Sequence, residues 1–161
     1  MAILEIKEYG EPVLREKAIP IKEITPEILN FIKDMAETMY ADSGVGLAAP
    51  QVGVSKRIIL VDGEEDGLIV LINPVIIKSE GELIDEEGCL SVPGIYSQVK
   101  RSLKVTVKAL NENGDPIEIT KEGLTARALQ HEIDHLDGIL FIDRIGRITR
   151  QILLNKLKKK K

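Results

Sequence analysis

The chain has 161 residues, 43% of them hydrophobic, and a formal net charge of −4 at pH 7, which together predict one globular domain over residues 1–161. No apolar run approaches the roughly 20 residues of a membrane-spanning helix, and the acidic balance argues against nucleic-acid binding, sequence-specific binding included. No basic leader precedes an apolar block near the N-terminus, so we expect a cytoplasmic protein without a secretory signal.

The first third of the chain contains a clear helix signal. Thr25 followed by Pro26 is typical of an N-cap with proline at the first helical position. The apolar residues that follow share one helical face; they are Ile28, Ile32, Met35 and Met39. We expect this helix to end near Tyr40, because Asp42-Ser43-Gly44 is a breaker.

The middle of the chain is rich in strand signals. Short apolar runs bounded by turn residues predict strands over 57–61 and 68–72. Alternating apolar and polar residues predict a half-buried strand over 103–109. Asn113-Gly114 is a hairpin turn signal, after which the alternation resumes. These elements indicate mostly antiparallel sheets.

The last third is helical. Leu124, Ala128, His131 and His135 form one helical stripe, and Gly138 is a suitable C-terminal stop. A final amphipathic, Lys-rich helix is predicted over about 147–161; its apolar residues include Ile148, Ile152 and Leu153. The predicted class is α+β, with mostly antiparallel sheets around a central metal-binding helix, plus an N-terminal and a C-terminal helix.

Both histidines of the chain lie in one motif on the central helix, H-E-x-x-H over residues 131–135. Residues four apart on a helix point the same way, so His131 and His135 can bind one metal ion. Glu132 lies about 100° around the helix from His131, where it can reach a water molecule as a general base. A motif with three fixed letters also arises by chance, so H-E-x-x-H alone does not establish a metal site without a further ligand.

A catalytic metal site needs three protein ligands and an open position. Cys89 is the only cysteine, and its thiolate is a soft donor to Zn²⁺ or Fe²⁺. The alternative is that Cys89 is a small buried apolar residue, although neighbours such as Gly88, which would let the backbone approach a ligand, are not typical of a core strand. Asp137 should face away from His135, and Asp143 is a possible ligand without a motif around it.

A third segment, residues 44–51, reads Gly-Val-Gly-Leu-Ala-Ala-Pro-Gln. Its small residues let the backbone pass close to a ligand. One interpretation is a substrate-binding strand in which Gln51 donates its side-chain amide to an oxygen. The other is a plain connection between a helix and a strand, with Gln51 exposed.

These segments, in this order, resemble the three motifs of the peptide deformylase family. They are Gly44–Gln51, Glu87–Ser91 and Gln130–His135. The resemblance also covers 11–15 and 136–138, and thus nearly the whole chain. It implies a metal-dependent hydrolase that removes the N-formyl group from the N-terminal formylmethionine of newly made polypeptides and releases formate.

The resemblance also implies roles for single residues. Cys89, His131 and His135 would hold one divalent ion, natively Fe²⁺, with Zn²⁺, Ni²⁺ or Co²⁺ as substitutes. Glu132 would move the proton, while the Gln51 side chain and the Leu90 N–H would hold the oxyanion. The residues implied in substrate binding are Gly44, Val45, Gly46, Leu124 and Ala128. In the family an arginine often stands at the position of Tyr96.

Two other functions compete with this interpretation. A small zinc endopeptidase of the HExxH type usually takes a downstream Glu or a third His as ligand, and this chain has neither. A structural zinc module needs four protein ligands, and no fourth Cys or His exists. The lysines at 156 and 158–161 are either a solvated helix end or an anchor on an acidic partner such as ribosomal RNA.

Overall fold

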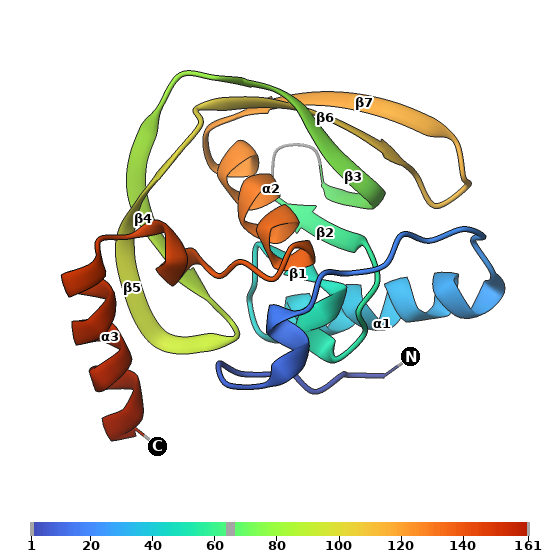
Figure 1. The fold of residues 1–161 in the computed structure, drawn as a ribbon. Coiled ribbons are helices and arrows are strands. Elements are labelled where there is room, and N and C mark those ends of the chain that lie inside the picture. Colours follow the sequence, from blue (N-terminus) through green and yellow to red (C-terminus); the bar gives the residue numbers. More distant parts are fainter. Residues whose placement is uncertain (1, 64–66, 161) are drawn as a thin grey trace.

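The computed structural model describes residues 2–63 and 67–160. A five-stranded antiparallel sheet has the order β1-β2-β3-β6-β7, and a separate two-stranded sheet pairs β4 with β5. The strands are β1 Gly46–Ala48, β2 Ile58–Asp62, β3 Leu68–Glu80, β4 Leu83–Cys89, β5 Val92–Arg101, β6 Lys104–Leu110 and β7 Pro116–Glu122. Figure 1 shows helix α2 in the middle of the molecule, with the curved sheet over it and the β4–β5 pair to one side. The predicted α+β class is confirmed.

The helices lie close to where the sequence predicts them. They are α1 Pro26–Ala41, α2 Gly123–Leu136 and α3 Arg147–Lys160, with short 3-10 helices η1 Pro12–Arg15, η2 Ala49–Val52 and η3 Phe141–Arg144. The Thr25 hydroxyl accepts a hydrogen bond from the Ile28 N–H at 3.2 Å, which confirms the predicted N-cap. Gly138 follows α2 with φ at 75°, the left-handed conformation that suits a helix stop.

Strand β3 continues well beyond the predicted 68–72. The register of its pairing with β6 shifts between Ile72 and Val75, and Asn73 has φ at 55°. Pro74 lies in this irregular stretch. Proline has no N–H to donate, and the hydrogen bonds between β3 and β6 are already interrupted there. The prediction stopped at the local break, whereas pairing with β6 carries the strand past it.

Strand β2 is buried on both faces, which explains its continuous apolar run. Ile58 and Leu60 pack into a cluster with residues of α1, while Ile59 and Val61 pack into another with residues of α2. Because successive side chains of a strand point to opposite faces, α1 and α2 cover opposite sides of this part of the sheet. The site helix α2 is thereby fixed against a rigid strand.

Helix α3 packs against β5 and η3 through Leu153, Leu154 and Leu157. Ile148 and Ile152, predicted as part of the apolar face, are instead 78% and 61% exposed. The periodicity identified the helix but not which of its apolar residues face the core. None of the described helices is long and apolar enough to cross a membrane.

Candidate active site

Three side chains with metal-binding atoms converge at the centre of the molecule. Cys89 ends strand β4, and His131 and His135 lie one turn apart on α2. His135 Nε2 lies 3.2 Å from His131 Nε2 and 3.4 Å from Cys89 Sγ. Within the described parts of the chain this is the one cluster of at least three such residues, and its ligand atoms all lie within 4.8 Å of one another.

The donor set fits a divalent ion. Metal bonds of about 2.0–2.3 Å to nitrogen and sulfur give tetrahedral edges of roughly 3.3–3.6 Å. The separations of His135 Nε2 from His131 Nε2 and from Cys89 Sγ, 3.2 Å and 3.4 Å, are close to these values. Burial disfavours the charged form of His131, but the charge of Glu132 and the hydrogen bonds of Cys89 and Glu87 outweigh it and raise the pKa of His131. Burial and the charge on His131 lower the pKa of His135, which suits a neutral ligand. Surroundings that attract a proton to His131 also attract a cation.

Glu87 orients His131 from behind. Its Oε2 lies 2.9 Å from His131 Nδ1, which leaves His131 Nε2 facing His135 Nε2 at 3.2 Å. Its other oxygen accepts from both Arg101 and Arg127 at 2.8 Å. Burial raises the pKa of Glu87, but the hydrogen bonds of Arg101 and His131 more than offset this and hold it far below its usual range. Glu87 therefore stays ionised.

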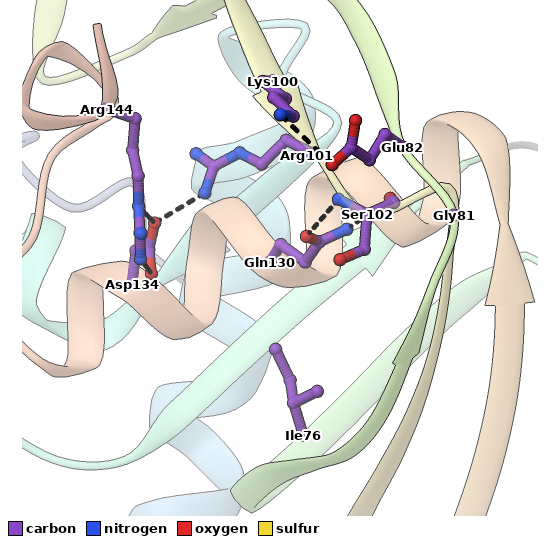
Figure 2. Close-up of a pocket in the computed structure, with 9 residues that line it drawn as sticks. All are labelled: Ile76, Gly81, Glu82, Lys100, Arg101, Ser102, Gln130, Asp134 and Arg144. Atoms are coloured by element: carbon purple, nitrogen blue, oxygen red, sulfur yellow. Dashed lines mark hydrogen bonds and ion pairs between the residues drawn. The ribbon is translucent and has the colours of Figure 1, made fainter.

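The ion pairs continue along α2 to Asp134, three residues after His131. Arg101 Nη1 also lies 2.6 Å from Asp134, whose carboxylate is held by Arg144 at 2.7 Å as well. Figure 2 shows these residues around a polar cavity of about 320 Å³, where Gln130 bonds the backbone of Ser102. This cavity shares no residue with the predicted site. Its charged walls are paired with one another, so we assign it a structural role.

Glu132 is buried, and its carboxylate lies beside the backbone of β1. A Cβ placed on Gly46 would be 2.6 Å from Glu132 Oε2. Within the described residues Glu132 Oε1 has no hydrogen-bond partner. Burial raises the pKa of Glu132 to about 7, against the opposing charge of His131. An unpartnered carboxylate with such a pKa suits a group that takes up and returns a proton near neutral pH.

Gln51 is 1% exposed, so the interpretation as an exposed connection is wrong. Its Oε1 accepts from the Ala48 N–H at 2.9 Å, which fixes the orientation of the amide. Its Nε2 therefore faces the metal-binding cluster, where it donates to Ser91 Oγ at 3.2 Å and points at Cys89 Sγ at 3.5 Å. An N–H donor is thus held beside the metal-binding atoms.

A cleft of about 600 Å³ lies beside the cluster, and its walls include Gln51, Cys89, His131 and Glu132. All the residues predicted to bind substrate line it, together with Leu90; these are Gly44, Val45, Gly46, Leu124 and Ala128. Val45 and Leu124 are partly exposed at 38% and 58%, whereas Ala128 is buried. The cleft therefore offers an apolar surface beside Glu132 and Gln51.

Two features at the cleft differ from the simplest expectation. Glu87 and Gly88 do lie in a strand, β4, although in the small two-stranded sheet. The group that approaches Gly88 is a side chain of the protein itself, because a Cβ there would lie 2.5 Å from the Tyr96 ring. Tyr96 thus forms part of the rim of the cleft and is 60% exposed.

The alternative third ligands are used elsewhere. Asp137 pairs with Arg57 at 3.1 Å, and Asp143 pairs with Arg15. Neither belongs to the cluster around His135. With both carboxylates engaged by arginines, the site lacks the acidic ligand of a zinc endopeptidase, and the described residues offer no fourth ligand for a closed zinc site.

The structure brings the predicted residues together at the cleft and the metal-binding cluster. Four charged residues that contact this site were not predicted, and two of them, Glu87 and Arg127, also line the cleft. Glu87 and Asp134 lie inside recognised motifs, and Arg127 precedes His131 by one helical turn, so spacing could have drawn attention to these three. Arg101 carries no local signal. It is 6% exposed in β5, and only the fold brings it to Glu87 and Asp134.

Comparison with known proteins agrees with this geometry. A sequence profile described as Polypeptide deformylase matches residues 3–151. A peptide deformylase of Halothermothrix orenii is 60% identical over 154 residues, which cover 95% of this chain and all of the relative. A crystal structure of a peptide deformylase from Legionella pneumophila aligns with a TM-score of 0.93 at 48% identity, covering 98% of this chain and 94% of that one. Another, from Ehrlichia chaffeensis in complex with actinonin, aligns at 0.94 with 36% identity over 100% and 99% of the two chains.

Proposed function

Because this chain belongs to the polypeptide deformylase family, it is a hydrolase that removes the N-formyl group from newly made polypeptides, and we propose that the cleft at Cys89 performs the reaction. The observation that carries the assignment is the buried carboxylate of Glu132, whose Oε1 has no hydrogen-bond partner among the described residues, beside the cluster of Cys89, His131 and His135. The alignment over nearly the full length of both chains supports the same reaction here.

The enzyme is metal-dependent, as its family is, and Cys89, His131 and His135 are the residues that would hold the ion. The ion supplies a Lewis acid that lowers the pKa of a bound water from about 15.7 towards 7. From the resemblance to the family we propose Fe²⁺ as the native ion. The thiolate and two imidazoles would also accept Zn²⁺, Ni²⁺ or Co²⁺.

The protein residues would divide the chemistry as follows. Glu132 takes a proton from a water molecule, and the oxygen of that water molecule attacks the formyl carbon. The Gln51 amide and the Leu90 N–H donate to the oxygen that becomes negative. Glu132 then returns the proton to the leaving nitrogen, the C–N bond breaks, and formate and a free amino terminus result. Val45, Leu124 and Ala128 would contact the methionine side chain, with Gly44 and Gly46 beside the substrate backbone.

The enzyme acts on formylated nascent chains, and we propose that it does so in the cytoplasm, where such chains are made. The basic end of α3 would keep it near the ribosome by contacts to RNA phosphates. Lys156, Lys158 and Lys159 are exposed, which supports this role, and the helix dipole also favours cations at a C-terminal end. Lys161 lies outside the described residues.

The direct test measures formate released from a formyl-Met peptide. Enzyme reconstituted with Fe²⁺ should release formate together with a new amino terminus, and enzyme stripped by a chelator should do neither until metal is restored. The same peptide without its formyl group serves as the control for endopeptidase activity, which would cleave an internal peptide bond. Cleavage of the internal bond, or formate release unaffected by chelation, would contradict the proposed reaction.

A further inference from the structure

The N-terminal segment 7–18 contacts all three parts of the chain that carry the proposed site residues. It includes η1 and lies beside the end of α2, in blue in Figure 1. No step of the proposed mechanism uses it. Its backbone nevertheless donates hydrogen bonds to backbone carbonyls of η2, of the turn after β4 and of the end of α2.

The first contact is to the residue that carries the proposed oxyanion donor. The backbone N–H of Lys7 donates to the carbonyl oxygen of Gln51 at 2.6 Å. The side chain of Gln51 is already oriented by Ala48, so this bond fixes the remaining freedom of its backbone. A shift of that backbone would move Nε2 relative to Cys89.

The second contact is to the turn that follows Cys89. Two residues after Lys7, the Tyr9 N–H donates to the carbonyl oxygen of Ser91 at 2.8 Å. The Ser91 hydroxyl in turn accepts from Gln51 Nε2, and the Ser91 N–H points at Cys89 Sγ at 3.4 Å. One short stretch of chain thus joins η2 to the turn that carries the thiolate.

The third contact is to the end of the helix that carries the histidines. The Ala18 N–H donates to the Leu136 carbonyl at 2.8 Å, and Arg15 Nη1 donates to the Gly138 carbonyl at 3.1 Å. The last carbonyls of a helix have no partner within it, so donors from another segment stabilise that end. His135 lies one residue before Leu136, so the hydrogen bond from Ala18 also restrains the backbone at His135.

Apolar contacts follow the same path. Ile6, just before the segment, packs against the cluster that contains Leu47 and Ala49, and Tyr9 packs against the cluster near Cys89. Ala18 is part of the cluster that contains residues of α2. Residues 6–18 therefore contact three hydrophobic clusters of the protein.

We infer that segment 7–18 is a positioning element for deformylation, which holds Gln51 Nε2 in a fixed place relative to Cys89 and the two histidines. The inference rests on the proposed role of Gln51. Its sharpest consequence concerns a single hydrogen bond, that from the Lys7 N–H. Without the Lys7 N–H, we expect the Gln51 side-chain amide, which donates to the oxyanion, to shift. We expect the cleft that binds the peptide to stay in place.

Lys7→Pro removes that donor. We expect kcat to fall about 10-fold with KM within about 2-fold, because small misplacement of a group that acts in the transition state affects kcat most. Glu8→Pro is the matched control, since no described group accepts the Glu8 N–H and the side chain is exposed. If Lys7→Pro fails to fold, the α-hydroxy analogue of lysine at position 7 replaces the N–H by oxygen without adding a ring.

A double-mutant cycle with Gln51→Leu separates positioning from general damage. Gln51→Leu alone should lower kcat by about 10²–10³, and Lys7→Pro should then cause no further loss. An equal further loss in the Gln51→Leu background, a similar loss with Glu8→Pro, or an unchanged kcat on removal of the Lys7 N–H would overturn the inference. Full kcat in Gln51→Leu alone would instead overturn the proposed role of Gln51.

Discussion

The carboxylate of Glu132 lies where a side chain on Gly46 would have to be. A Cβ built on Gly46 would be 2.6 Å from Glu132 Oε2 and 2.9 Å from its Cγ. Atoms at such distances overlap, so the missing side chain lets β1 run directly beside the proposed catalytic carboxylate. The position of Glu132 by itself requires a glycine at 46, independently of any contact between Gly46 and substrate.

Gly46→Ala should therefore displace Glu132 and lower kcat by about 10-fold or more, because the proton would have to move over a longer path. Metal content, measured by atomic emission, should stay at one ion per chain. Gly146→Ala is the matched control, since a Cβ there meets nothing within 4 Å among the described residues. Equal activity of the two variants would show that Glu132 tolerates displacement.

Glu132→Gln tests the proton shuttle itself. The amide cannot accept and return a proton, so activity should fall by about 10² or more while the metal stays bound. Turnover on a formyl-Met peptide and metal content are measured on the same sample. Loss of the ion in this variant would mean that Glu132 is a ligand.

Cys89→Ser should empty or weaken the metal site, because a neutral hydroxyl replaces a thiolate. Peroxide should inactivate the Fe²⁺ enzyme faster than the Zn²⁺ enzyme, since Zn²⁺ has no redox chemistry and only the thiolate remains oxidisable. Metal affinity is measured by competition with a chromogenic chelator. A Cys89→Ser protein with full metal content and full turnover would refute the three-ligand site.

Arg101→Met leaves the carboxylates of Glu87 and Asp134 buried without their shared partner. Removing one member of a buried ion pair costs about 3–5 kcal/mol, and we expect that loss in the free energy of unfolding from urea titration. Lys100→Met is the control, since its side chain is 60% exposed and its pair with Glu82 should contribute about 0–1 kcal/mol. Equal stability of the two variants would mean that the network is not strongly coupled.

Deletion of Lys158–Lys161 tests the basic end of α3. The cut must spare Leu157, which is 4% exposed and packs in the core with β5 and η3. Turnover on a short peptide should be unchanged, while co-sedimentation with ribosomes at low salt should weaken, with a difference that shrinks as salt rises.

A control variant distinguishes local contacts from total charge. Replacing four exposed lysines elsewhere by glutamine gives the same change in charge; these are Lys22, Lys33, Lys56 and Lys108. This variant should sediment nearly as the wild type does. Equal loss in both variants would point to net charge, and no loss on deletion would leave the tail as a solvated helix end.

The sequence by itself determined the elements whose signals are local. The N-cap at Thr25, the stop at Gly138 and the spacing of His131 and His135 each depend on a few neighbouring residues, and the structure agrees with them. The chain has no other cysteine or histidine, so the sequence favoured Cys89 as the third ligand over Asp143, and the structure places Cys89 beside both histidines.

Only the tertiary structure decided what lies behind and beside those residues. Arg127 meets Glu87 across 40 positions of the chain, and Arg15 meets Gly138 across 123. Periodicity carries no information on such pairs, since it records which face of an element is apolar and not which element covers that face. For the same reason the sequence could not tell that Leu157 of α3 is buried while Ile152 is exposed, or that the N-terminal segment joins all three parts of the site.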